Sequence, residues 1–129
     1  MPDERRADLC NYRMKNSEDS LTVAEDCLKK GLYRDAINRS FYAIKALLAL
    51  EEVDFKKHKD VVAYFNRTYA ATEKIPREIG RKLARLQQKR EKSDYDDFYI
   101  ASKEETMEQI ENTKSVILAV KDYLSRMEN

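Results

Sequence analysis

The stretch YRDAINRSFYAIKALLALEE, residues 33–52, decides the fold class. One set of its apolar side chains recurs at the three- and four-residue spacing of a helix face, at Ala36, Ile37, Phe41, Ile44, Leu47 and Leu48. A second set fills most of the remaining circumference, at Tyr42, Ala43, Ala46, Ala49 and Leu50. A helix that is apolar nearly all round is packed on several sides. The segment therefore predicts the central helix of a bundle.

The rest of the composition favours helices throughout. The chain has 129 residues, the size of one domain, and contains only two Gly and two Pro. Charged residues make up 38% of it. Few turn residues combined with many Ala, Leu, Lys and Glu are typical of long helices. We predict an all-α fold and one domain over residues 1–129.

Two helices are predicted on the N-terminal side of residue 75, flanking the central one. The first covers residues 3–30, with small or apolar residues on one face and Gly31 as its C-terminal stop; the face comprises Cys10, Met14, Ser17, Leu21, Ala24 and Leu28. After the linker VDFKKHK, residues 53–59, a shorter helix is predicted over residues 59–71. Its inner face comprises Val62, Phe65 and Tyr69.

Two further helices complete the pattern. A fourth begins at Ile75-Pro76, since proline suits the first turn of a helix. Its inner stripe comprises Ile79, Leu83, Leu86 and Arg90. A fifth begins at Ser102, with Glu105 completing a capping box; its predicted inner face comprises Met107, Ile110, Thr113, Ile117, Val120, Leu124 and Met127. The five helices predict an up-and-down bundle.

Several function classes are disfavoured. The net charge of +1 argues against coating duplex DNA by bulk charge, although a local basic patch stays open. Cys10 and Cys27 lack metal-type spacing, and we expect both to be small core residues. No apolar run reaches the length of a bilayer span, and the N-terminus has no signal-peptide core. We expect a cytoplasmic protein that binds no membrane, metal or cofactor.

The central helix carries the first candidate site, in NRSFYAIK, residues 38–45. Arg39 and Tyr42 are three residues apart and share one side of the helix, with Asn38 beside them. An arginine on a buried helix needs a carboxylate, a phosphate or a partner surface. The structural alternative is an internal ion pair with Asp94 or Asp96.

The second candidate site is KREKSDYDDFYIAS, residues 89–102. Arg90 occupies the next inward position after Leu86, so we expect its guanidinium to point into the bundle or a cleft. We expect the fourth helix to end here and a link held by Tyr95, Phe98 and Tyr99 to follow. In the plainer interpretation, Arg90 and the aspartates clamp this link to the central helix.

Three segments in this order resemble the HEPN domain family: DAINRSFYAIKALLALEEVDF (35–55), HKDVVAYF (58–65) and REKSDYDDFYIASKEE (90–105). The resemblance implies a helical bundle that forms a homodimer and works beside a minimal nucleotidyltransferase protein. Many members resemble metal-independent RNases with a motif in which four to six residues separate an arginine from a following histidine. Arg90 fits the arginine position, whereas Tyr95 stands where the shortest spacing would place the histidine.

That substitution weakens the catalytic interpretation. A histidine with a pKa near 6.5 can take a proton at neutral pH, whereas a tyrosine with a pKa near 10 is a poor base. The one histidine of the chain, His58, could replace it only if the fold brings it near Arg90.

Three hypotheses follow. The preferred one is a toxin–antitoxin type module that binds a nucleotide or RNA through Arg90, Arg39, Tyr42 and Tyr95, with Asn38, Asp94 and Asp96 around them. The second is a metal-independent RNase toxin that uses Arg90 with Tyr95 or His58. The third is a helical scaffold that binds another protein and no nucleic acid.

Overall fold

The computed structural model describes residues 2–48, 58–95 and 100–127; for 2–7, 10, 45–48, 58–61, 93–95 and 127 the description covers the backbone alone. These ranges form α1 (Pro2–Lys29), α2 (Tyr33–Leu48), α3 (His58–Phe65), α4 (Arg77–Tyr95) and α5 (Lys103–Met127). A short π-helix, η2 (Asn66–Ala70), follows α3 directly. Every regular element in the described ranges is a helix, which confirms the all-α class.

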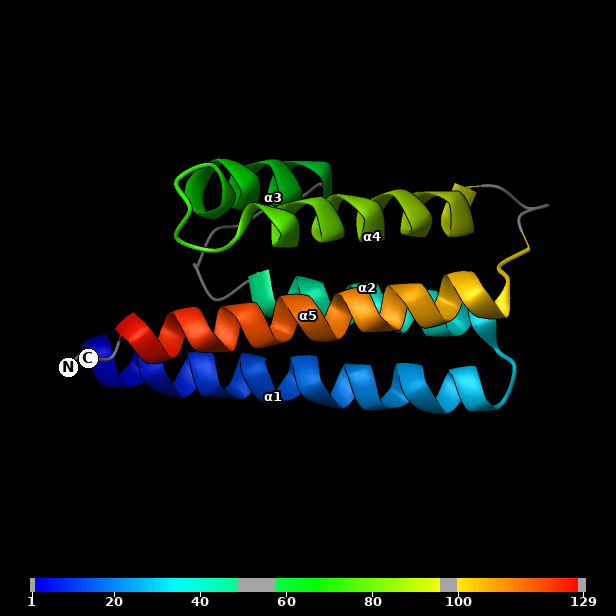
Figure 1. Ribbon diagram of the computed structural model, residues 1–129. Coiled ribbons are helices and arrows are strands. Elements are labelled where there is room, and N and C mark those ends of the chain that lie inside the picture. The colour runs from blue at the N-terminus through cyan, green and yellow to red at the C-terminus, as the bar shows by residue number, and fades with distance from the viewer. Residues whose placement is uncertain (1, 49–57, 96–99, 128–129) are drawn as a thin grey trace.

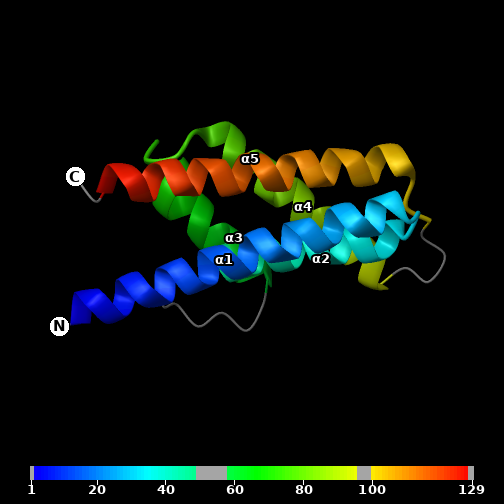
Figure 2. The same cartoon turned by 90° about the horizontal axis from the view of Figure 1, so that it is seen from below.

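Helix α2 is central, as predicted. It contacts α1, α3, α4 and α5. Figures 1 and 2 show α1 on one side of the α2–α5 pair and α4 with α3 on the other. The buried positions of α2 are Ala36, Ile37, Ser40, Phe41, Ala43 and Ile44. Tyr42 departs from the all-round apolar pattern, because its side chain is 46% exposed.

Helices α1 and α2 form a closely packed antiparallel hairpin. Gly31 adopts φ 77°, and the amide of Leu32 donates to the carbonyl of Cys27 at 2.8 Å, so α1 ends in a Schellman-type cap. Ser17 donates its hydroxyl to the carbonyl of Ala43 at 2.7 Å. Such a contact requires small residues where the helices cross. Cys27, expected in the core, is a half-buried free thiol.

Helix α5 begins where the capping box predicts. The hydroxyl of Ser102 accepts a hydrogen bond from the amide of Glu105 at 3.0 Å. The predicted inner positions Ile110, Thr113, Ile117 and Val120 are buried, but Met107 was placed wrongly, since it is 47% exposed. The buried arc of α5 is rotated toward polar residues that hydropathy alone does not select, namely Thr106 and Gln109, both fully buried.

Ion pairs flank α5 on two sides. Lys121 pairs with Glu18 at 2.6 Å and Lys114 with Glu25 at 3.8 Å, which sets α5 antiparallel to α1. Arg85 of α4 pairs with Glu108 of α5 at 2.6 Å. These are partly exposed pairs, so they set register more than stability.

Helix α4 confirms the inner stripe but is longer than predicted. Ile79, Leu83 and Leu86 are buried. The prediction that α4 ends at Arg90 was wrong, because the helix continues to Tyr95. Residues 89–95 contain neither Gly nor Pro, and Lys, Arg and Glu are good helix formers, so nothing local stops the helix.

The third predicted helix is two elements. α3 ends at Phe65 and η2 continues to Ala70, while the predicted inner residues Val62, Phe65 and Tyr69 are all buried. The ring of Tyr69 meets that of Tyr123 edge-on at 5.4 Å, which ties η2 to α5. The described part of the linker, from residue 58 onward, is helical and belongs to α3.

A strained residue follows η2. Glu73 has φ 59°, a conformation that costs a non-glycine residue about 1–2 kcal/mol. Its ion pair with Arg77 is long, at 3.6 Å, and exposed, so it offsets little of this strain. Glu73→Gly should raise the free energy of unfolding by about 0.5–1 kcal/mol, after the extra backbone entropy of glycine is subtracted.

Urea denaturation followed by circular dichroism measures this change. Glu111→Gly is the matched control, because Glu111 is exposed in the middle of α5 and carries the same charge. The free energy of unfolding of the Glu111→Gly variant should fall by about 1 kcal/mol. Equal losses in both variants would contradict strain at Glu73.

Candidate functional site

Arg90 is the inward-facing cation of α4. Its side chain is half-buried, and its guanidinium carbon lies 5.0 Å from the ring centroid of Phe41 and 5.6 Å from that of Tyr42. Guanidinium is weakly hydrated and stacks well on aromatic rings. The inner stripe therefore accepts an arginine at this end of α4, as the sequence predicts.

Two guanidinium groups lie close to the ring of Tyr42. Arg39 of the same helix places its guanidinium carbon 5.8 Å from the Tyr42 centroid, and Arg90 approaches from α4. We call Arg39, Tyr42 and Arg90 the arginine–tyrosine cluster. It joins residues about fifty positions apart in the sequence, and nearly half of the Tyr42 side chain stays accessible.

Arg39 differs from its prediction in one respect. The side chain is exposed, so its charge is solvated and needs no internal carboxylate. No acidic side chain within the described residues forms an ion pair with it. The proposed pair with Asp94 or Asp96 falls where no side chain is described.

Asn38 lies one helical turn before Tyr42 on α2. It is half-buried, and its Oδ1 is buried without a hydrogen-bond partner in the described part of the chain. An unsatisfied buried carbonyl costs about 1–3 kcal/mol. One side of α2 therefore carries three of the predicted residues, Asn38, Arg39 and Tyr42. Arg90 of α4 approaches the same side at Tyr42.

The other predicted residues are placed by their backbone alone. Asp94 and Tyr95 end α4, His58 is the first residue of α3, and Asp96 lies outside the described residues, as do Phe98 and Tyr99. Because α4 is continuous here, Arg90 and Tyr95 are about 140° apart around its axis. The five-residue spacing therefore does not align them on one face of α4.

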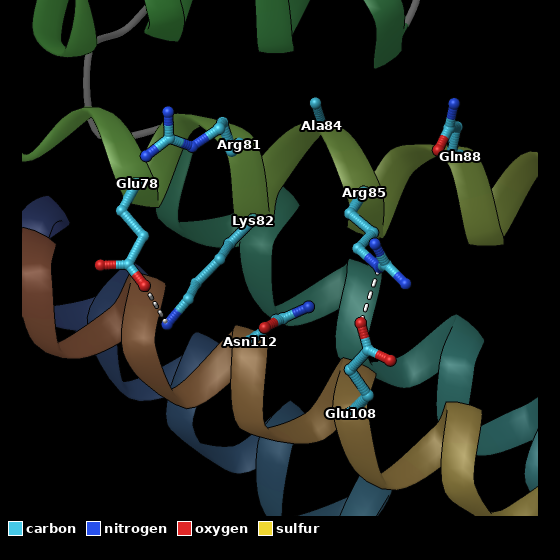
Figure 3. Close-up of a pocket in the computed structure, with 8 residues that line it drawn as sticks. All are labelled: Glu78, Arg81, Lys82, Ala84, Arg85, Gln88, Glu108 and Asn112. Carbon is cyan, nitrogen blue, oxygen red and sulfur yellow. Dashed lines mark ion pairs between the residues drawn. The ribbon is translucent and has the colours of Figure 1, made fainter.

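Sequence reasoning missed two features of the site. Phe41 was assigned to the core alone, yet it also supports Arg90. A groove of about 430 Å³ on the outer side of α4 was not predicted; it is lined by Glu78, Arg81, Lys82, Ala84, Arg85, Gln88, Glu108 and Asn112 (Figure 3). The recurrence of basic residues at positions 77, 81 and 85 was the available signal.

Neither a metal cluster nor a bilayer span occurs in the described ranges. These residues contain no group of three or more His, Cys, Asp or Glu arranged to hold a metal ion. Across the same ranges, no helix combines the length and apolar content that a bilayer span requires.

Comparison with known proteins identifies the family. The family model for the HEPN domain matches residues 10–123, nearly the whole chain. The chain belongs to the HEPN domain family. Its all-α fold agrees with the resemblance stated from the sequence.

Three relatives of this HEPN domain are informative. A Thermotoga maritima protein named "UPF0332 protein" is 27% identical over 120 residues, which cover 90% of this chain and 91% of the relative. Two proteins of Methanocaldococcus jannaschii carry the names "Putative toxin MJ0605" and "Putative toxin MJ0142". They are 34% and 29% identical, over 61% and 71% of this chain and 62% and 65% of their own lengths.

Proposed function

We propose that this HEPN domain is a toxin-like module that binds RNA at the arginine–tyrosine cluster. One observation carries the proposal: the guanidinium carbons of Arg39 and Arg90 lie 5.8 Å and 5.6 Å from the ring centroid of the half-exposed Tyr42. The toxin names of the two Methanocaldococcus relatives support the biological role.

The cluster combines the two groups that RNA recognition needs. Guanidinium forks bind phosphate oxygens bidentately. An accessible aromatic ring stacks on an unpaired base, an interaction worth about 1–3 kcal/mol per base. Because Phe41 supports Arg90 from the core side, the guanidinium is oriented before RNA arrives, which lowers the entropy cost of binding.

Assembly belongs to the same proposal. We propose that the domain forms a homodimer and acts with a nucleotidyltransferase protein, as one half of a toxin–antitoxin type pair. A dimer with the clusters facing a common groove would double the number of arginines available to one RNA strand. Size-exclusion chromatography with light scattering measures the assembly state, and co-purification with a co-expressed minimal nucleotidyltransferase protein tests the pairing.

RNA binding is tested by substituting the cluster. Titration of a short fluorescein-labelled RNA of mixed sequence should give at least about tenfold weaker binding for Arg90→Ala and Tyr42→Leu than for the wild type. Lys15→Ala and Tyr12→Leu are the matched controls, since both residues are exposed on α1, far from the cluster in sequence. Their affinities should remain within about twofold of the wild type.

The same incubations distinguish binding from cleavage. A gel of the RNA after incubation with EDTA shows whether the strand stays intact. Intact RNA with weakened binding in the cluster variants supports the binding module. Equal affinities for all variants and the wild type, or no binding at low salt, would refute a role of the cluster in RNA binding.

A further inference from the structure

The outward face of α4 is strongly basic. Between Arg77 and Lys92 the helix carries seven basic residues against two acidic ones: Arg77, Arg81, Lys82, Arg85, Lys89, Arg90 and Lys92 against Glu78 and Glu91. Four of the basic residues recur on the side of α4 opposite the buried stripe. We call Arg77, Arg81, Arg85 and Lys92 the outward stripe; all four are exposed.

The groove lies along this stripe. Figure 3 shows Lys82 and Arg85 reaching from α4 toward α5, with Asn112 of α5 between them, while Gln88 projects from the side of α4 away from α5. Lys82 also donates to the hydroxyl of Ser115 at 3.1 Å. The groove therefore offers guanidinium, ammonium and amide donors to an anion.

The carboxylates beside the groove are already engaged. Glu78 pairs with Lys82 at 3.6 Å and Glu108 with Arg85 at 2.6 Å. Arg81 and Lys92 form no ion pair with any residue in the described ranges. The local balance is thus positive, and since exposed pairs contribute little, Arg85 can exchange its carboxylate for a phosphate at small cost.

The chemistry of the face favours RNA over a protein partner. Stable protein interfaces are centred on buried aromatic or aliphatic anchors. The exposed large apolar side chains of the described residues lie on α1, α2, α5 and the segments beside them, and none lies on α4 between Arg77 and Lys92, where the side chains of this helix are described. A cationic face without an apolar anchor is suited to a polyanion.

The dimensions also fit a nucleic-acid strand. Arg81 and Lys92 are eleven residues apart, which is about 16 Å along the helix axis. At about 3.4 Å per nucleotide of a stacked strand, this spans about five phosphates. Arg85 lies between them, so one strand can contact several cations of the stripe at once.

We infer that the outward stripe is a second RNA-binding surface, which holds the phosphodiester backbone without reading the bases. The inference rests on the proposed RNA-binding function, and adds to it a surface on the opposite side of α4 from Arg90. The arginine–tyrosine cluster contacts bases and phosphates at one position, and the stripe extends the contact along the strand.

The test measures how salt weakens binding of the same fluorescein-labelled RNA. The double variant Arg81→Gln/Lys92→Gln should lower the affinity by about tenfold or more near 0.1 M salt. It should also reduce the slope of log affinity against log salt by about 1.4–1.8, or roughly 0.7–0.9 for each phosphate that the variant no longer neutralises. Lys15→Gln/Lys30→Gln removes two exposed charges from the region of α1 and should leave the slope nearly unchanged.

The outcomes separate this inference from the proposed function. If wild type and Arg81→Gln/Lys92→Gln bind RNA with the same affinity and slope, while Arg90→Ala binds weakly, the stripe is excluded and the cluster stands. If the double variant loses affinity for an acidic protein partner but not for RNA, the stripe is a protein surface and the inference is wrong. Failure of the wild type to bind RNA overturns both.

Discussion

Replacing Phe41 by alanine should lower the free energy of unfolding by about 3–5 kcal/mol, the largest loss we expect from any single truncation in this chain. Phe41 is 2% exposed and lies on the central helix, within the main hydrophobic cluster. Removal of its ring leaves a cavity bordered by several helices, which cannot all close at once. It also removes the aromatic surface 5.0 Å from the Arg90 guanidinium.

A second substitution separates packing from guanidinium positioning. Phe41→Leu retains most of the buried apolar volume, so it should lower the free energy of unfolding by only about 1–2 kcal/mol. It removes the aromatic face beside the Arg90 guanidinium, so it should still weaken RNA binding. Tyr12→Ala is the control, because this aromatic side chain is 64% exposed and its loss should stay within about 0.5 kcal/mol.

Urea denaturation at one fixed protein concentration gives these values, since the stability of an assembling protein depends on concentration. A loss below about 1 kcal/mol for Phe41→Ala would contradict the central position of α2. Unchanged RNA affinity in Phe41→Leu would contradict the supporting role of the ring.

Gly80→Val should destabilise the protein by about 3 kcal/mol. A Cβ at Gly80 would lie 2.6 Å from Oδ1 of Asn66 and 3.0 Å from Cβ of Ala70, both on η2. Gly80→Ala should cost about 1 kcal/mol, because the gain in helix propensity offsets part of the clash. The branched valine adds two further carbons in the same closed space.

The substitution Asn66→Ala tests whether the loss of stability in Gly80→Ala comes from the clash with Asn66. It removes the oxygen nearest to the new Cβ, and that oxygen has no hydrogen-bond partner among the described residues. Combined with Asn66→Ala, Gly80→Ala should become nearly neutral, with a coupling energy of about 1 kcal/mol in a double-mutant cycle. Strictly additive effects would show that α4 and η2 do not meet at these residues.

Much of the architecture was predictable because it follows from local rules. The stripe of Ile79, Leu83 and Leu86 is buried, Ser102 caps α5, and Gly31 ends α1 in the left-handed conformation that favours glycine. Each of these depends on spacing or on the chemistry of neighbours within one helical turn.

Two predictions were wrong for different reasons. Met107 is apolar but exposed, while Thr106 and Gln109 are polar and fully buried, because the rotation of α5 depends on the helices that pack against it. Helix α4 runs on to Tyr95, since the absence of Gly and Pro between residues 89 and 95 favours continuation over a link. Hydropathy does not distinguish these outcomes.

The candidate site was predictable in part. Arg39 and Tyr42 share a face of α2 by their spacing, and Arg90 continues an inward stripe, so each was selected from the sequence. That Arg90 meets Phe41 and Tyr42 is a long-range contact between α2 and α4. The groove beside Arg81 and Asn112 likewise forms only where α4 and α5 lie side by side.

The sequence by itself determined an all-α bundle around residues 33–48 and the inward position of Arg90, because helix periodicity and capping are local properties of the chain. The tertiary structure alone decided that Tyr42 is half exposed close to two arginines and that α4 and α5 together form a groove with basic side chains. These depend on how rigid helices rotate and cross to fill a shared core, which sums many weak contacts far apart in sequence.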